Sequence, residues 1–295
     1  MSELLTTEEA ATYLRLSERK LYDLVAAGAV PCTKATGRWL FPKSDLDQWL
    51  AAEAIKPQAL SRAPAPAIVG GSQDPLLDWA LRESGSGLAS LPEGSESGLR
   101  RLRNREVAAA AIHLHRLNGD DENANIDAIA ADSSLYDAVV FSFVRREQGL
   151  LVASGNPKNL TDMKSVLQSK ARLAMRPQGA GAQLLLLALL KAAEADAAHI
   201  SKDAPVCHTG ADVAQAVRGG RADCGIATRA VAAAAGVDFV PLVWERFDLV
   251  LRQRDYFLPA QQALFTFLRS AAFRHRAKEL PGYDAEEAGS IRLAK

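Results

Sequence analysis

Residues 208–252, HTGADVAQAVRGGRADCGIATRAVAAAAGVDFVPLVWERFDLVLR, decide the fold of most of the chain. Helical patterns and short apolar runs alternate along this stretch. We expect a helix over 210–218, a strand over 222–226, a helix over 229–235 and a strand over 248–252. Strands that alternate with helices are typical of an α/β fold with parallel sheets.

The same alternation extends outward from this stretch, from residue 67 to residue 295. A break near 140–154 indicates two lobes joined by crossing strands, and we place the hinge there and near 245–255. The other expected strands cover 67–69, 87–91, 107–114, 138–144, 150–153 and 172–175, and the other expected helices cover 75–83, 97–104, 161–169, 182–195 and 259–278.

Three glycine-rich loops each follow an expected strand and open a helix: GGSQD (70–74), EGSESG (93–98) and QGAG (178–181). Glycine lets the backbone approach a ligand closely, and the amides at a helix N-terminus attract anions. Ligands of open sheets bind beyond the carboxyl ends of the strands. No loop has the Walker or GxGxxG pattern, which disfavours a nucleotide site. The candidate ligand-binding residues in these loops are Gly71, Ser72, Gln73, Ser95, Glu96, Ser97, Gly179, Ala180 and Gly181.

The first 52 residues form a separate unit. Thr6 and Glu9 have the spacing of a capping box that opens a first helix, and Ser17 can cap a second helix. The tight turn between these two helices is typical of a helix-turn-helix. A third helix is expected from Ser44. Segments 30–33 and 38–41 can pair as a wing that turns at 35–37. We therefore divide the chain into a winged helix-turn-helix domain at 1–52, a proline-interrupted linker at 53–66 and an effector-binding domain at 67–295.

Basic residues gather in the N-terminal unit. Residues 15–43 hold six Lys and Arg against two acids, a surplus of four. The alternative for these charges is a solvated face in which Arg19 pairs with Asp23 one turn later. Tyr22, Trp39 and Trp49 are expected in the core. The candidate DNA-contacting residues, at the start of the second helix and in the wing, are Ser17, Arg19, Lys20, Lys34 and Arg38.

The stretch LTTEEAATYLRLSERKLYDLVAAGAVPCTKATGRWLFPKSDLDQWL (5–50) resembles the excisionase-type winged helix-turn-helix family. That family shows L-T-x-x-E-A-A-x-Y-L, then S-x-x-x-[LV]-Y, then G-R-x-x-F-x-x-x-D-[LV]-x-x-W. Nearly every landmark is present. The resemblance implies that this unit binds DNA.

The large domain resembles the type II periplasmic-binding-protein fold, and more closely the PBP-like domain of bacterial regulators related to molybdate-binding proteins. RPQGAGAQLLLLALL (176–190) and the opening stretch, 208–252, carry the likeness. It implies that Ala227, Thr228, Glu245 and Phe247 lie toward the ligand. The family's hydroxyls in G-[ST]-G-[TS] are alanines here, at 180 and 182. This departure weakens a direct transfer of molybdate or sulfate binding.

Two further residues offer positive charge to an anion, Arg176 and His113. The alternative for His113 is a hydrogen-bonded histidine at the end of an apolar strand. Arg145 and Arg146 sit in the expected hinge, and the alternative for them is a purely structural role in ion pairs.

Composition limits the function. Thirty-five basic residues balance 35 acidic ones, which excludes a histone-like coat on nucleic acid. No charge-free apolar run reaches the roughly 18 residues of a membrane span, and the acidic start lacks the pattern of an export signal. The three scattered cysteines form no CxxC pair, so we expect reduced thiols, no metal site and a cytoplasmic protein.

The sequence therefore predicts a one-component transcriptional regulator, not an enzyme, because no catalytic motif is present. Expected partners are operator DNA and a small anionic effector, either molybdate or tungstate or a small carboxylate such as formate. No other cofactor is expected. Two half-sites on DNA require a homodimer or homotetramer. Two alternatives stay open: a ligand-free dimerisation or docking scaffold, and a cytosolic enzyme on the same two-lobed fold.

Overall fold

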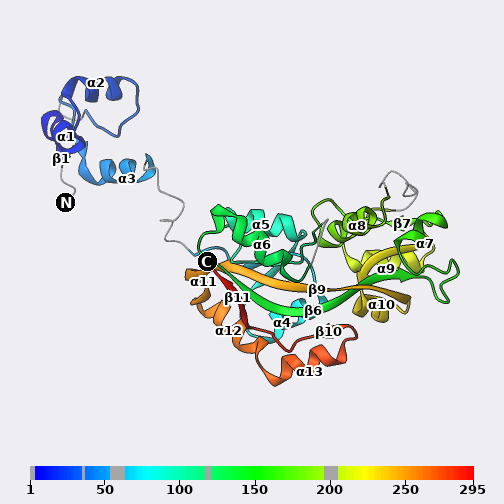
Figure 1. Ribbon diagram of the computed structural model, residues 1–295. Helices are drawn as coiled ribbons and strands as arrows, with labels where there is room; N and C mark the ends of the chain where they lie inside the picture. Colours follow the sequence, from blue (N-terminus) through cyan, green and yellow to red (C-terminus); the bar gives the residue numbers. More distant parts are fainter. Residues whose placement is uncertain (1–3, 35–36, 54–63, 117–120, 196–204) are drawn as a thin grey trace. The chain divides into compact units, whose positions relative to one another are not determined.

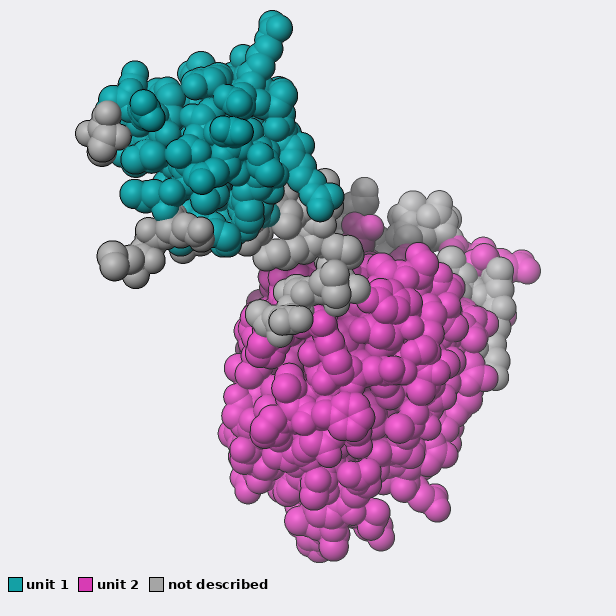
Figure 2. Space-filling view, turned by 90° about the vertical axis from the view of Figure 1, so that its left-hand side faces the viewer, with its two compact units in different colours: residues 1–63 teal, residues 64–295 magenta. Residues whose placement is uncertain are grey.

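The computed structural model describes residues 4–34, 37–53, 64–116, 121–195 and 205–295. The chain divides into two compact units, unit 1 at residues 1–63 and unit 2 at residues 64–295 (Figure 2). No helix in the described ranges is both long enough and apolar enough to cross a lipid bilayer.

Unit 1 has the expected helices. Helix α1 (Thr7–Leu14) begins at the capping box of Thr6 and Glu9, and α2 (Glu18–Ala26) begins at Ser17, whose hydroxyl accepts a hydrogen bond from Lys20 N at 3.3 Å. Helix α3 (Lys43–Glu53) starts one residue before the expected Ser44. These helices pack on a small core of Ala10, Ala11, Leu21, Val30, Phe41 and Leu46.

The wing is smaller than predicted. A single bridge joins Thr33 to Leu40, whereas Phe41 pairs with Leu5 in a two-stranded sheet of β1 (Leu4–Leu5) and β2 (Phe41–Pro42). Residues 35 and 36 of the expected turn lie outside the described residues. The prediction that Tyr22 is a core residue is wrong, because its neighbour Leu21 faces the core and Tyr22 turns outward with 48% of its surface exposed.

Unit 2 is a mixed α/β domain (Figure 1). Its described strands are β3 (Ile68–Gly71), β4 (Ala89–Pro92), β5 (Ala109–Ile112), β6 (Ala138–Val152), β7 (Leu173–Ala174), β8 (Cys224–Thr228), β9 (Asp238–Arg252), β10 (Tyr283–Asp284) and β11 (Ile291–Ala294). Its described α-helices are α4 (Pro75–Glu83), α5 (Ser95–Arg103), α6 (Ala124–Ala131), α7 (Met163–Gln168), α8 (Gly181–Ala192), α9 (Gly210–Arg218), α10 (Arg229–Ala235), α11 (Gln253–Tyr256), α12 (Pro259–Leu268) and α13 (Ala271–Glu279).

Two long antiparallel strands run through the middle of unit 2. β6 and β9 pair along their whole length, from Ala138 opposite Arg252 to Val152 opposite Asp238 (Figure 1). The sequence prediction split β6 into two strands and began β9 ten residues late. It was wrong because residues 145–148 are charged or polar yet continue the strand. Arg146 and Gln148 find a buried partner in Glu245 on β9, and Glu147 pairs with Arg229 of α10.

The two strands connect two lobes. Lobe 1 contains β3, β4, β5, α4–α6 and the C-terminal helices; lobe 2 contains β7, β8 and α7–α10. The sheet order β4-β3-β5-β9-β6-β8-β7 places a parallel group at each end and the crossing pair between them. Each lobe has its own buried apolar core. The expected helix 259–278 is two helices, because the chain breaks at residues 269–270 and Ser270 caps α13. Helix α6 was not predicted.

Candidate functional site

A cleft of about 400 Å³ lies between the two lobes of unit 2. The loops that line it precede helices α4, α5, α8, α9 and α10, so helix N-termini from both lobes surround it. The polar residues that line it are Ser72, Gln73, Glu93, Ser97, Arg100, His113, Arg146, Gln148, Arg176, His208, Thr209 and Thr228.

A buried hydroxyl network holds the wall that lobe 1 contributes. Ser95, fully buried, lies 2.8 Å from the Ser72 hydroxyl, and its own hydroxyl accepts from His113 N at 3.0 Å. Gly71, with φ +107°, packs so closely on Ala111 that a side chain would lie 2.3 Å from the Ala111 carbonyl. Ser95 and Gly71 therefore position the loops from behind and do not line the cleft.

The wall from lobe 2 begins with an open helix end. The N-cap residue of α8 is Ala180, which offers no side-chain hydrogen bond to the first amides. Those amides lie at the cleft, where Ala180, Gly181 and Ala182 all line it. Because positions 180 and 182 are alanines, without the hydroxyls of the similar family, no side chain caps the first backbone amides of α8. Such an end carries partial positive charge.

The lobes touch across the mouth of the cleft. Glu96 N donates to Gly179 O at 3.3 Å. A methyl group added to Gly94 would lie 3.2 Å from Ala180 Cα, and one added to Gly181 would lie 2.3 Å from His113 Cε1. Only glycine permits this approach at position 181, so the structure describes a closed arrangement of the two lobes.

Arg176 brings a positive charge to the cleft. Its guanidinium donates to two carbonyl oxygens, Cys207 O at 2.9 Å and His208 O at 2.7 Å, and forms no salt bridge with a carboxylate among the described residues. Burial lowers the pKa of Arg176 from its ordinary value, although a guanidinium keeps its charge at neutral pH. This charge therefore has no ion-pair partner among the described residues, although Asp212 acts on it at longer range.

Arg146 lies at the floor of the cleft, between two buried carboxylates. It donates to Asp74 Oδ2 at 2.7 Å and to Glu245 Oε1 at 2.6 Å, and stacks on the Phe247 ring at 4.1 Å. Burial lowers its pKa, but the charges of both carboxylates outweigh burial and raise it. No described residue accepts from its third nitrogen, Nη2.

Three other polar groups surround Glu245. Gln148 donates to Oε1 at 3.0 Å, while His113 Nδ1 and His115 Nε2 lie 3.0 and 2.8 Å from Oε2. Burial would raise the pKa of Glu245, but the interaction with His113, the charge of Arg146 and the hydrogen bonds of both histidines hold it well below its usual range. Burial lowers the pKa of His113 to about 4, so this imidazole is neutral at pH 7.

The structure brings most of the candidate ligand-binding residues together. Eight of them line the cleft: Ser72, Gln73, Ser97, His113, Arg176, Ala180, Gly181 and Thr228. The other six lie outside this lining, namely Gly71, Ser95, Glu96, Gly179, Glu245 and Phe247. Glu245 and Phe247 are buried behind the floor, where they hold Arg146.

Sequence reasoning missed several cleft residues, among them Arg100, Gln148, His208 and Thr209. Thr209 had a detectable signal, since T-x-x-D is a capping box that opens α9. The pair of Arg146 and Glu245 had none, because 99 positions separate the two residues.

In unit 1, α2 presents the basic residues predicted for DNA contact. Arg19 and Lys20 are exposed in its first turn, and Arg19 forms no salt bridge with Asp23. Lys34 Nζ lies 5.2 Å from the centre of the Trp39 ring, and Arg38 is exposed beside it. The exposed Tyr22 adds an aromatic ring to α2.

Comparison with known proteins agrees with both units. The model of the PBP superfamily domain matches residues 78–269, and that of the helix-turn-helix domain matches residues 4–54. "Uncharacterized protein YvgK" of Bacillus subtilis (strain 168) is 27% identical over 307 residues, which cover 98% of this chain and 97% of that protein.

Two solved structures share the fold of unit 2. A putative phosphate ABC transporter substrate-binding protein from Clostridium perfringens, with bound phosphate, has a TM-score of 0.52 at 10% identity and covers 72% of this chain and 96% of its own. The tungstate ABC transporter from Geobacter sulfurreducens has a TM-score of 0.50 at 13% identity, with coverages of 70% and 94%. The chain belongs to the PBP superfamily domain family and joins that ligand-binding domain to an N-terminal helix-turn-helix DNA-binding domain, the composition of a DNA-binding regulator with an effector domain.

Proposed function

We propose that this chain is a one-component transcriptional regulator whose interlobe cleft senses a small anion. The effector class comprises tetrahedral oxyanions such as molybdate and tungstate, and small carboxylates such as formate. The helix-turn-helix domain binds the operator through Ser17, Arg19 and Lys20 on α2 and through Lys34 and Arg38 near the Thr33–Leu40 bridge.

Arg176 carries the proposal. The Arg176 guanidinium faces the cleft and donates only to carbonyl oxygens, so it has no ion-pair partner in the described ranges, and an anionic ligand would supply one. Glu93 is the acidic residue of the cleft lining, and it already forms an ion pair with Arg101 at 2.5 Å. The local field in the cleft therefore favours negative charge.

Backbone amides add to this field. The uncapped start of α8 points at the cleft, and the start of α5, whose N-cap Gly94 also lacks a side-chain bond, faces it from lobe 1. Helix N-termini stabilise anions by their free N–H groups and the helix dipole. The fold accommodates such ligands elsewhere, since one of its solved neighbours holds phosphate and another is named for tungstate.

Closure of the lobes links the cleft to DNA binding. An anion that touches both α5 and α8 binds the closed arrangement more tightly than the open one and shifts the equilibrium toward it. The hinge then lies in the crossing strands, near 140–154 and 245–255. A single small domain reads few bases, so we expect two or four copies to bind paired half-sites.

A thermal-shift series on the full-length protein tests the sensor. Molybdate, tungstate, sulfate, phosphate and formate are added separately. A ligand at 100 times its Kd stabilises the folded state by about 2.7 kcal/mol. For a domain of this size, that corresponds to a rise in Tm of roughly 5–10 °C.

The matched variants are Arg176→Gln, which should lose the shift, and Arg218→Gln, an exposed arginine on α9 that should keep it. If no anion raises Tm at millimolar concentration, the sensor proposal is overturned in favour of a ligand-free docking scaffold. If an anion raises the Tm of Arg176→Gln as much as that of the wild type, Arg176 is not part of the binding site.

A further inference from the structure

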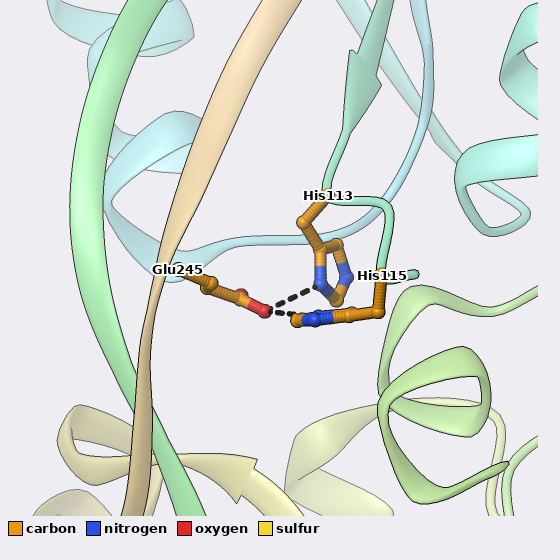
Figure 3. Close-up of side chains that lie close together, drawn as sticks. All are labelled: His113, His115 and Glu245. Carbon is orange, nitrogen blue, oxygen red and sulfur yellow. Dashed lines mark hydrogen bonds and ion pairs between the residues drawn. The ribbon is translucent and has the colours of Figure 1, made fainter. Parts of the chain in front are cut away.

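Two histidines and a carboxylate converge behind the floor of the cleft. His113 Nδ1, His115 Nε2 and a Glu245 oxygen all lie within 4.8 Å of one another (Figure 3). Their side chains are at most 6% exposed. The two rings meet edge to face, with centroids 5.9 Å apart, and both direct a nitrogen at Glu245 Oε2 (Figure 3).

The surrounding protein holds both the backbone that carries the histidines and the carboxylate of Glu245. On the histidine segment, His113 N is held by the Ser95 hydroxyl at 3.0 Å, and Leu114 N donates to Asn125 Oδ1 at 2.8 Å. Residues two apart on an extended chain point to the same side, which explains why both imidazoles reach one point.

On the carboxylate, Arg146 and Gln148 both bind Oε1, at 2.6 and 3.0 Å. Oε2 is left to the two histidines. Outer partners that orient a carboxylate in this way are a regular feature of metal sites.

The donor set selects a class of ion. Two imidazoles and one carboxylate suit zinc and its divalent transition-metal neighbours, whereas calcium and magnesium prefer oxygen ligands throughout. Bonds of about 2.0–2.1 Å at tetrahedral angles separate ligand atoms by roughly 3.3 Å. The separations of 3.0 and 2.8 Å from Glu245 Oε2 would need to widen by a few tenths of an ångström, and the two imidazole nitrogens, which lie within 4.8 Å of each other, would need to settle near the same spacing. Rotation of the side chains is the adjustment this requires.

Charge also favours a cation here. Asp74 and Glu245 bring two negative charges to this buried cluster, and Arg146 brings one positive charge. With neutral imidazoles, the form in which histidine binds a metal, one negative charge is left over. An ion bound at Glu245 Oε2 would offset it.

We propose that His113 Nδ1, His115 Nε2 and Glu245 Oε2 bind one divalent transition-metal ion of the zinc type. His115 also lines a second hollow, between α6 and α8, although its side chain is fully buried. Three protein ligands leave one position for water or another small molecule.

The ion would change what the cleft offers to an anion, and this consequence rests on the function proposed above. While Nδ1 of His113 donates to Glu245, its Nε2 is a bare acceptor, and this nitrogen faces Gly181 at the start of α8. With a metal on Nδ1, the proton moves to Nε2, which becomes a donor. Metal binding should therefore strengthen anion binding.

Metal binding is measured first, without any anion. Full-length protein is stripped with a chelator and titrated with Zn²⁺ by calorimetry and with Co²⁺ by visible absorption. We expect one equivalent per chain and a tetrahedral Co²⁺ spectrum. His115→Ala should weaken Zn²⁺ binding by at least the roughly 10–100-fold seen when even an outer partner of a metal ligand is lost.

Two further variants separate the site from other effects. His275→Ala removes a histidine that is 79% exposed on α13 and should bind like the wild type. His115→Cys keeps a metal ligand and should restore binding, with a thiolate-to-cobalt absorption band that a merely structural histidine could not produce. Circular dichroism of each variant shows whether it is folded.

The proposal is overturned if His115→Ala binds Zn²⁺ with the same stoichiometry and affinity as the wild type. It is also overturned if the wild type binds neither Zn²⁺ nor Co²⁺, and the cluster is then a hydrogen-bonded support for Arg146. The anion series is then repeated with and without Zn²⁺. An anion shift without metal binding would refute only the metal site, and metal binding without any anion shift would refute only the sensor.

Discussion

Replacing Gly181 with alanine tests whether the two lobes close onto each other in solution. The added methyl group would lie 2.3 Å from both Cε1 and the carbonyl oxygen of His113, well inside the 3.0 Å below which real contacts of this kind essentially never occur. The carbonyl belongs to the backbone, so the clash is relieved by moving the lobes apart. Overpacking of this kind costs about 1–3 kcal/mol. Because the cost falls on the closed arrangement alone, the ratio of closed to open molecules should fall roughly 5- to 150-fold.

Amide hydrogen exchange measures this ratio without any ligand. Glu96 N donates to Gly179 O across the cleft, and opening frees that amide. In Gly181→Ala, the amide of Glu96, followed in a peptide over residues 93–98, should exchange roughly 5- to 150-fold faster than in the wild type. The exchange rates of peptides from the crossing strands should stay the same. Gly219→Ala, on an exposed turn of lobe 2, is the matched control. Unchanged exchange at residue 96 would refute the closed contact, and faster exchange throughout lobe 2 would mean that the variant unfolds.

Three other predictions concern DNA, pH and packing. Arg38→Ala should weaken operator binding and reduce the slope of log K against log salt by about 0.9, the value of one phosphate contact. Fluorescence anisotropy measures this slope, and a slope equal to that of the wild type would exclude the contact. Hydrogen bonds from Arg172 lower the pKa of Asp223, so its carboxylate stabilises the fold above the unfolded pKa of about 3.9 and loses this effect as pH falls through the folded value. Asp223→Asn should therefore melt below the wild type at pH 7, with a gap that narrows in acid; a constant gap would contradict this. Ser95→Ala leaves His113 N without its partner and should lower the free energy of unfolding by about 1–3 kcal/mol, measured by urea denaturation.

The N-terminal unit shows how far local signals reach. Both predicted caps, at Thr6 and Ser17, are present, because a cap depends on residues within one turn of each other. The wing was less well predicted, since Phe41 pairs with Leu5, a residue 36 positions earlier in the chain. Tyr22 looked apolar enough for the core, but only the packing of Leu21 decides which side of α2 faces inward.

The crossing strands show where local signals fail. Charged and polar residues at 145–148 read as a break, yet they continue β6 because Arg146, Glu147 and Gln148 form ion pairs and hydrogen bonds with β9 and α10. A pattern of hydrophobicity cannot distinguish a solvated turn from a strand whose charges are paired inside the protein.

For this protein the sequence alone determined the two-part organisation, the α/β class and the loops that open helices at the cleft, because helical periodicity, caps and glycines act over short distances. The tertiary structure decided which of these residues meet. Arg146 reaches Glu245 across 99 positions, and the two histidines meet Glu245 across 132 and 130 positions. Pairings of that kind exist only after the lobes fold around the crossing strands, since the energy of a buried charge depends on the partner that the fold places beside it.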